Sequence, residues 1–193
     1  MLTRLFPVLF SLVNVAPALA GDVEDLTPTL MAECPIRRSF ELAQAAAGAQ
    51  IPGPQLGLAY FRVARGYPYA DFYFHSKDFH AQRYVEVNCA RGLYEIGGWD
   101  YLTPQAVPVL ADVSDLIDPA AALARAQVLL PGQRFNYMQL EVRVAGPRLL
   151  LGQDWGRRHP VVIFDFSQGT VQVRRWNEVL KQFVIDREEP IRS

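Results

Sequence analysis

Residues 161–173 read VVIFDFSQGTVQV and have the pattern of a β-hairpin. The stretch opens with a nearly continuous apolar run, which is typical of a strand covered on both faces. Val171 and Val173 then alternate with polar residues, which indicates a strand with one face in water. The three-residue loop 167–169 between them ends in glycine, where a positive φ is needed. The stretch therefore predicts two antiparallel strands joined by a short turn.

The sequence also contains a weak internal repeat. Short chance matches between alanine-rich helices are common, so a single pair of similar segments would mean little. Matches that recur in the same order indicate a duplicated unit. Three pairs of segments match in this way: 42–45 with 123–126, 61–64 with 142–145, and 84–96 with 161–173.

Each half is predicted to begin with a helix and to continue with extended segments. The first helix is expected over residues 35–49. In the second half, Asp118 is a good N-cap and Pro119 a good first residue of a helix that ends by Gly132. Residues 99–117 between the halves hold acids and prolines and are interpreted as a linker. Alternation and turn residues predict strands at 56–65, 70–75, 83–89, 137–144, 148–153, 161–166 and 170–175.

The C-terminal segment 177–187 is predicted to be a further helix. Asn177 is a plausible cap, and the apolar residues that follow lie at helical spacing, which places them on one stripe. These residues are Val179, Leu180, Phe183 and Val184.

Together these elements predict an α+β fold of two cystatin-like repeats, each an antiparallel sheet wrapped around a helix, with a C-terminal helix. The first repeat is assigned to residues 21–101, and the second repeat with the final helix to residues 102–193. The pattern leaves open whether the two sheets join.

The second half resembles the PepSY family of small exported bacterial modules. The resemblance is carried by residues 120–130, by the strand 140–144, and by the hairpin 163–171 with its Asp165-x-x-x-Gly169 turn. In the first half, Asn88 stands where the aspartate would be. The resemblance implies a non-catalytic module that binds or restrains partner proteins such as peptidases, and it brings no catalytic residue or cofactor with it.

Residues 1–20 have the features of a cleavable signal peptide. Arg4 is followed by an apolar run over 5–15 and then by Ala18-Leu19-Ala20, the small residues that signal peptidase reads. The run is too short to span a bilayer as a helix. We therefore expect a periplasmic or secreted protein, and the arginine-rich, alanine-rich composition favours a Gram-negative bacterium. The formal net charge of −1 argues against nucleic acid as a partner.

The chain has two cysteines, Cys34 and Cys89. In an oxidising compartment a pair most often forms a disulfide, so we expect a Cys34–Cys89 bridge. The alternative is a free catalytic or redox thiol, although no Cys-x-x-Cys motif is present.

No motif predicts catalysis, a metal site or a cofactor. His75 and His80 lie five residues apart in an extended stretch, which sends their rings to opposite faces unless a turn intervenes. Residues 76–78 could provide that turn, and Asp71 or Asp78 could then complete a site. This is the basis of an alternative hypothesis, a small envelope hydrolase that uses the two histidines and nearby acids.

Aromatic residues are concentrated between positions 60 and 101. A sheet packed on a helix buries only one face of each strand, whereas residues 69–74 place aromatic rings on both faces. We therefore expect the rings of the other face to contact a partner. The basic doublet Arg157-Arg158 could receive an acidic group. The predicted partner face consists of Tyr69, Phe72, Tyr73, Phe74, Trp99, Arg157 and Arg158. The leading functional hypothesis is a non-catalytic exported binding or inhibitory module that engages a protein of the bacterial envelope.

Overall fold

The structure is a computed structural model that describes residues 24–153 and 159–191. The predicted signal peptide, Arg157 and Arg158 lie outside the described residues. Three helices are found in the described part of the chain: α1 (Pro28–Ala32), α2 (Ile36–Gly48) and α3 (Pro119–Leu129). The strands are β1 (Gln55–Ala64), β2 (Tyr67–His75), β3 (Ala81–Asn88), β4 (Leu93–Asp100), β5 (Tyr137–Arg143), β6 (Gly146–Gly152), β7 (Val161–Asp165), β8 (Thr170–Asn177) and β9 (Gln182–Pro190).

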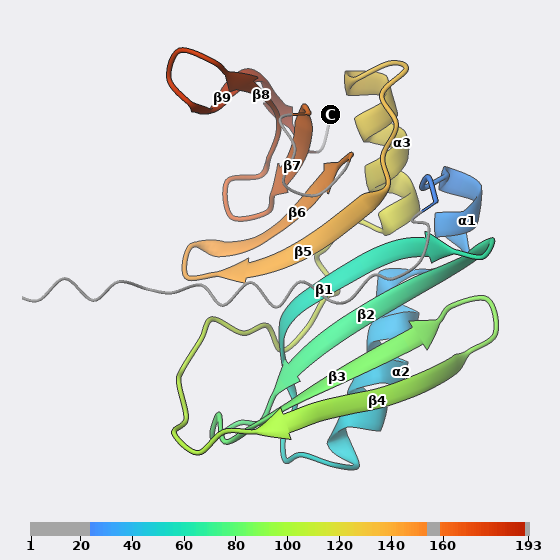
Figure 1. Ribbon diagram of the computed structural model, residues 1–193, viewed down its shortest axis with the longest axis vertical. Coiled ribbons are helices and arrows are strands. Elements are labelled where there is room, and N and C mark those ends of the chain that lie inside the picture. Colours follow the sequence, from blue (N-terminus) through green and yellow to red (C-terminus); the bar gives the residue numbers. More distant parts are fainter. Residues whose placement is uncertain (1–23, 154–158, 192–193) are drawn as a thin grey trace, which may run out of the picture.

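The strands form one antiparallel sheet of nine, in the order β4-β3-β2-β1-β5-β6-β7-β8-β9. Two meanders run outward from the centre, where β1 pairs with β5 over residues Leu58 to Phe61. Figure 1 shows the strands of the first half crossing α2 and those of the second half continuing the sheet beside α3. The question that the sequence left open is therefore answered: both halves belong to one continuous sheet.

The expected fold of two cystatin-like helix-plus-sheet repeats is wrong. Strands hold 45% and helices 18% of the described residues, so the protein is mostly β. The error has a physical origin. In two separate sheets, β1 and β5 would each be an edge strand with unpaired backbone N–H and C=O groups. Here the two strands hydrogen-bond to each other, which joins the two predicted sheets into one.

The predicted C-terminal helix is also wrong, because the segment forms the hairpin of β8 and β9. The side chain of Asn177 accepts hydrogen bonds from the backbone N–H groups of Val179 and Leu180, at 3.0 and 2.9 Å. Lys181 then adopts a φ of 50°, which completes the reversal. Val179 and Leu180 are exposed at the turn, so their helical spacing corresponds to no buried stripe.

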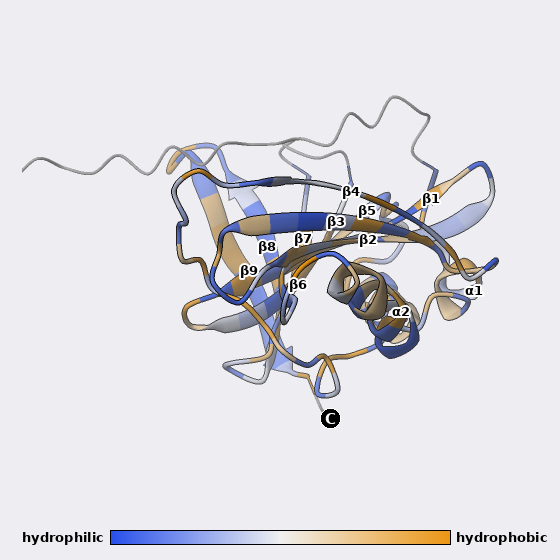
Figure 2. Ribbon diagram, turned by 90° about the horizontal axis from the view of Figure 1, so that it is seen from below, coloured by the Kyte–Doolittle hydropathy of each residue, from blue (hydrophilic) through white to orange (hydrophobic). Residues whose placement is uncertain are grey.

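A single apolar core lies between the helices and one face of the sheet. In the first half the ring of Phe40 on α2 packs against Phe72 and Phe74, with centroids 6.1 and 5.8 Å apart. In the second half α3 contributes small residues, Ala122 and Ala126, which are fully buried. Figure 2 shows α2 lying under the sheet, and none of the three helices of the described residues covers the opposite face.

The start of α2 is fixed from two directions. Cys34, just before the helix, forms the predicted disulfide with Cys89, with a Cα–Cα distance of 5.0 Å. The carboxylate of Asp118 accepts a hydrogen bond from the backbone N–H of Ile36, the first residue of α2, at 3.0 Å. Asp118 occupies the N-cap position of α3, as predicted, but its side chain makes no capping bond to α3. It therefore ties the second half to the first.

The linker prediction is confirmed for most of its length, since no helix or strand occupies residues 101–118 and only Leu110 forms an isolated bridge, to Leu56. Among the described residues, no helix is both long enough and apolar enough to cross a membrane.

Candidate functional site

The structure divides the predicted partner face between the two sides of the sheet. Phe72 and Phe74 point toward α2 and have no exposed surface, so they belong to the core. Tyr69 and Tyr73 alternate with them along β2, point away from the helices and are half-buried. Trp99, on the edge strand β4, keeps 43% of its surface exposed. Contact with a partner is therefore possible for the tyrosines and Trp99 but not for the two phenylalanines.

The helix-free side of the first half carries a compact group of rings and charges, which we call the tyrosine face. The cross-strand register places its members side by side on β1, β2 and β3. Its members are Tyr60, Arg62, Tyr69, Asp71, Tyr73, Tyr84 and Glu86.

Arg62 holds the centre of the tyrosine face. Its Nε donates to Asp71 Oδ2 at 2.8 Å, and its Nη2 donates to Glu86. Glu86 also accepts a hydrogen bond from the hydroxyl of Tyr84, at 2.9 Å. The guanidinium lies over the ring of Tyr69, 4.7 Å from its centroid. One arginine thus orders two carboxylates and two tyrosines.

The tyrosine rings form a row across the strands. Tyr60 meets Tyr73 edge to face at 6.0 Å, and Tyr73 meets Tyr84 at 5.2 Å between centroids. Burial, reinforced by nearby carboxylates, raises the pKa of the Tyr73 hydroxyl to about 12 and that of Tyr84 further. Both hydroxyls stay protonated at physiological pH. The Tyr84 hydroxyl donates its proton to Glu86, so only the Tyr73 hydroxyl of the two is available to donate to an incoming group.

Asp71 is the most deeply buried charge of the tyrosine face, only 3% exposed. Burial raises the pKa of its carboxyl to about 6, although the ion pair with Arg62 acts in the opposite direction, and the charge of Glu86 adds to the rise. The charge of the face therefore changes as the pH passes through about 6.

The same side of the second half has a different character. Glu141 accepts from Arg143 at 2.8 Å and lies 3.5 Å from Arg148. Farther along, the amide oxygen of Gln172 accepts from the guanidinium of Arg174 at 2.7 Å. Long polar chains that bond to one another replace the ring cluster, so the two halves present different surfaces.

The histidines of the hydrolase hypothesis occupy different environments. His75 is buried, stacks on Tyr101 with centroids 6.2 Å apart, and lies over Gly57, where a Cβ would come within 2.9 Å of the imidazole. Burial lowers the pKa of His75. His80 is exposed, and its backbone N–H bonds to Asp78. Within the described ranges, no three His, Cys, Asp or Glu side chains gather as a metal ion requires.

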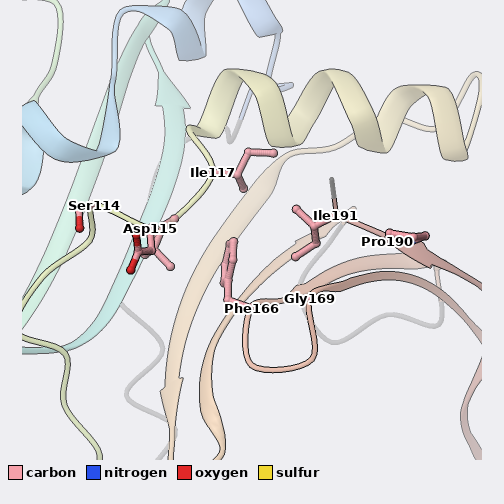
Figure 3. A pocket seen from close by; sticks show the side chains of 8 residues that line it. Ser114, Asp115, Ile117, Phe166, Gly169, Pro190 and Ile191 are labelled. Atoms are coloured by element: carbon pink, nitrogen blue, oxygen red, sulfur yellow. The ribbon is translucent and has the colours of Figure 1, made fainter. Parts of the chain in front are cut away.

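A pocket of about 570 Å³ lies in the second half, beside the start of α3. Figure 3 shows Ile117, Phe166 and Ile191 gathered around it, with Ser114 and Asp115 at the side of the first half. The backbone N–H of Ile191 bonds to the carbonyl of Gly169 at 2.9 Å, which fixes the C-terminal wall. The lining is mainly apolar, and the sequence reasoning did not foresee it because its three parts are far apart in the chain.

The ion network of the tyrosine face was also missed. Asp71 and Glu86 looked like ordinary acids on strands. The sequence nevertheless holds a signal for this network, because tyrosines and charged residues are spaced two apart on three strands. The three patterns are Tyr60-x-Arg62, Tyr69-x-Asp71-x-Tyr73 and Tyr84-x-Glu86. Residues two apart share one face of a strand.

Comparison with known proteins supports the fold alone. No protein-family model matches the sequence, and no curated protein matches it. Among solved structures, the crystal structure at 1.85 Å of a candidate lipoprotein from Clostridium difficile 630 is similar, with a TM-score of 0.52 and 7% sequence identity. The similarity covers 80% of this chain and 91% of the other. The PepSY resemblance stays a prediction.

The disulfide indicates that the chain resides in an oxidising compartment. Bonds such as Cys34–Cys89 form and persist where the surroundings are oxidising, and the cytosol keeps most thiols reduced. The chain is therefore an exported or envelope protein.

Proposed function

We propose that this protein is a non-catalytic module of the Gram-negative periplasm that binds, and thereby recruits or inhibits, a protein of the cell envelope. The observation that carries the proposal is the tyrosine face, a row of half-buried rings ordered by Arg62 on the side of the sheet opposite the helices that the structure describes. Tyrosine is enriched at the energetic centres of protein interfaces, because it buries a large area at small cost in side-chain entropy.

The order of this surface supports recognition of another protein rather than simple packing. The ion pairs of Arg62 fix Asp71 and Glu86, so little freedom is lost when a partner docks. The tyrosine rings supply apolar area beside these charges, and their hydroxyls give each ring a polar end. A partner that fits offers an apolar segment for the rings and a hydrogen-bond acceptor for the Tyr73 hydroxyl.

The hydrolase hypothesis lacks comparable support. It needs His75 and His80 to act together with an acid, whereas the first ring is buried against Tyr101 and the second side chain is exposed.

The proposal is tested by capture from an envelope extract with the mature chain, residues 21–193, attached to a support. We expect one envelope protein to be retained, and Tyr69→Ser with Tyr73→Ser to weaken its affinity about tenfold or more, as loss of interface tyrosines does. The matched control is Val179→Ser with Leu180→Ser, which removes exposed apolar surface from the turn between β8 and β9.

Thermal unfolding establishes that both variants are folded before affinities are compared. The affinity of the retained protein is then measured by titration against each purified variant. Equal affinity for the wild type, the face variant and the control would contradict the proposal.

A further inference from the structure

The two edges of the sheet are protected to very different degrees. The outer strand β9 carries Asp186, Arg187, Glu188 and Glu189 and ends at Pro190, the charges and proline that discourage another strand from pairing. The outer strand at the other end, β4, reads LYEIGGWD. It has no lysine, arginine or proline, and only Glu95 carries a charge inside the strand. An unprotected edge of this kind is open to strand addition.

Strand β4 also exposes large apolar side chains. Leu93 is 62% exposed, Tyr94 47% and Trp99 43%. Leu93 and Trp99 share the helix-free side with Glu95, whereas Tyr94 lies on the helix side, opposite Val87. A partner strand would therefore cover apolar surface on both sides of the sheet.

The backbone register fixes which groups are free at this edge. The N–H of Tyr101 bonds to the carbonyl of His80, and hydrogen-bonded pairs alternate along an antiparallel ladder. The odd-numbered residues of β4 therefore bond to β3. The N–H and C=O groups of Tyr94, Ile96 and Gly98 point outward.

We propose that β4 pairs with β4 of a second copy, antiparallel, about a two-fold axis at Ile96. This register lets the outward groups of Ile96 bond to the same residue of the other copy. It sets Leu93 opposite Trp99, Tyr94 opposite Gly98, and Glu95 opposite Gly97. Each glycine receives a larger neighbour, and no charge faces a like charge directly.

The sequence selects a second copy because the strand is complementary to itself. An axis at Glu95 would set the two carboxylates against each other, and an axis at Gly97 would place Glu95 against Trp99 and Tyr94 against Asp100. The axis at Ile96 avoids both. The charges of β9 prevent further addition at the other end, so assembly stops at a closed dimer. The sheet then continues through both copies, with the two tyrosine faces on the same side.

The dimer is tested by sedimentation of the mature, disulfide-bonded chain over a range of concentrations. We expect a concentration-dependent dimer. Leu93→Lys with Trp99→Lys sets like charges opposite each other twice and should abolish the dimer. Because both side chains are exposed, the fold should be retained. The matched control, Val179→Lys with Leu180→Lys, should dimerise as the wild type does.

A charge exchange makes the test specific for this register. Leu93→Glu with Trp99→Glu should also be monomeric alone, and mixing it with the lysine variant should restore a dimer of one copy of each. Glu95→Gln, which removes two diagonal carboxylates, should tighten the wild-type dimer. A monomer up to about 1 mM, or a dimer indifferent to these substitutions, overturns the proposal. The result does not depend on the envelope partner proposed above.

Discussion

The first half of the sheet, β1 to β4, and the second half, β5 to β9, share one apolar face but differ in how they are held and in what the other face presents. The first half is clamped to α2 by the disulfide and carries the tyrosine face around buried Asp71. The second half has no cysteine, packs an alanine-rich helix, and covers its outer side with Gln, Arg and Glu chains. The shared core constrains one face of the sheet, and the helix-free face is where the halves have acquired separate properties.

The largest expected difference between the halves comes from the disulfide. Replacement of Cys34 and Cys89 by serine should lower the free energy of unfolding by about 4 kcal/mol, because the bridge closes a loop of 55 residues in the unfolded chain. Denaturant unfolding measures the loss, and hydrogen exchange locates it.

We expect amide protection to fall first in α2 and at the hairpin of β3 and β4. The wild type treated with a reductant serves as the control and should behave in the same way. An equal fall in amide protection over β5 to β9 would contradict the expected difference between the halves, since the two halves would then unfold as one unit.

The next largest effect is the pH dependence contributed by Asp71. Its raised pKa means that the folded state binds the proton more tightly, so its contribution to stability is fully present below pH 3.8 and is lost as the pH rises through about 6. Asp71→Asn removes this titration. As the pH rises from 4.5 to 7.5, the free energy of unfolding of the variant should increase by about 2 kcal/mol relative to that of the wild type.

The measurement is denaturant unfolding of both proteins across this pH range. His75, whose pKa is lowered, acts with the opposite sign: its contribution is present above its unfolded pKa and is lost as the pH falls. It is common to both proteins and cancels in the difference. If the free energies of unfolding of the two proteins changed with pH in parallel, Asp71 would not contribute the pH dependence expected of the first half.

A smaller effect is expected where the second half supports the first. Asp118→Ala removes the acceptor for the N–H of Ile36 and should cost about 1 kcal/mol. Hydrogen exchange should increase in the first turn of α2, with little change in α3. Asp118→Asn keeps an acceptor oxygen and should restore most of the loss. Greater fraying of α3 than of α2 would contradict this assignment.

The smallest effect is expected at the turn between β8 and β9. Val179→Ser with Leu180→Ser should change stability by no more than about 0.5 kcal/mol, because both side chains are exposed. Thermal unfolding checks it. A loss of several kcal/mol would mean that these residues are buried, as the predicted C-terminal helix required.

Seven of the strands, β1 to β3 and β5 to β8, could be predicted because their signals are local, whereas β4 and β9 were not predicted as strands. Alternation in β8 and the glycine at position 169 define a hairpin without reference to the rest of the chain. The disulfide was predictable from two cysteines and an export signal. The join between β1 and β5 was not, because it pairs two edges that no short connection links.

The candidate site could be predicted only in part. Alternation along β2 already separates Tyr69 and Tyr73 from Phe72 and Phe74, so the division of the predicted face was available from the sequence. The burial of Asp71 was not, because Arg62 and Glu86 come from two other strands. The C-terminal segment was ambiguous since four apolar residues fit a helical stripe and a hairpin equally well.

The hydrogen bond from Ile36 to Asp118 also has a consequence for biosynthesis. A chain that is threaded through a membrane from its N-terminus delivers α2 and the first four strands well before Asp118 arrives. During that interval the helix has its cysteine partner within reach but lacks the acceptor at its first turn. Oxidation of the thiols can thus precede the docking of α3, and the order of emergence favours covalent closure of the first half before the sheet is completed.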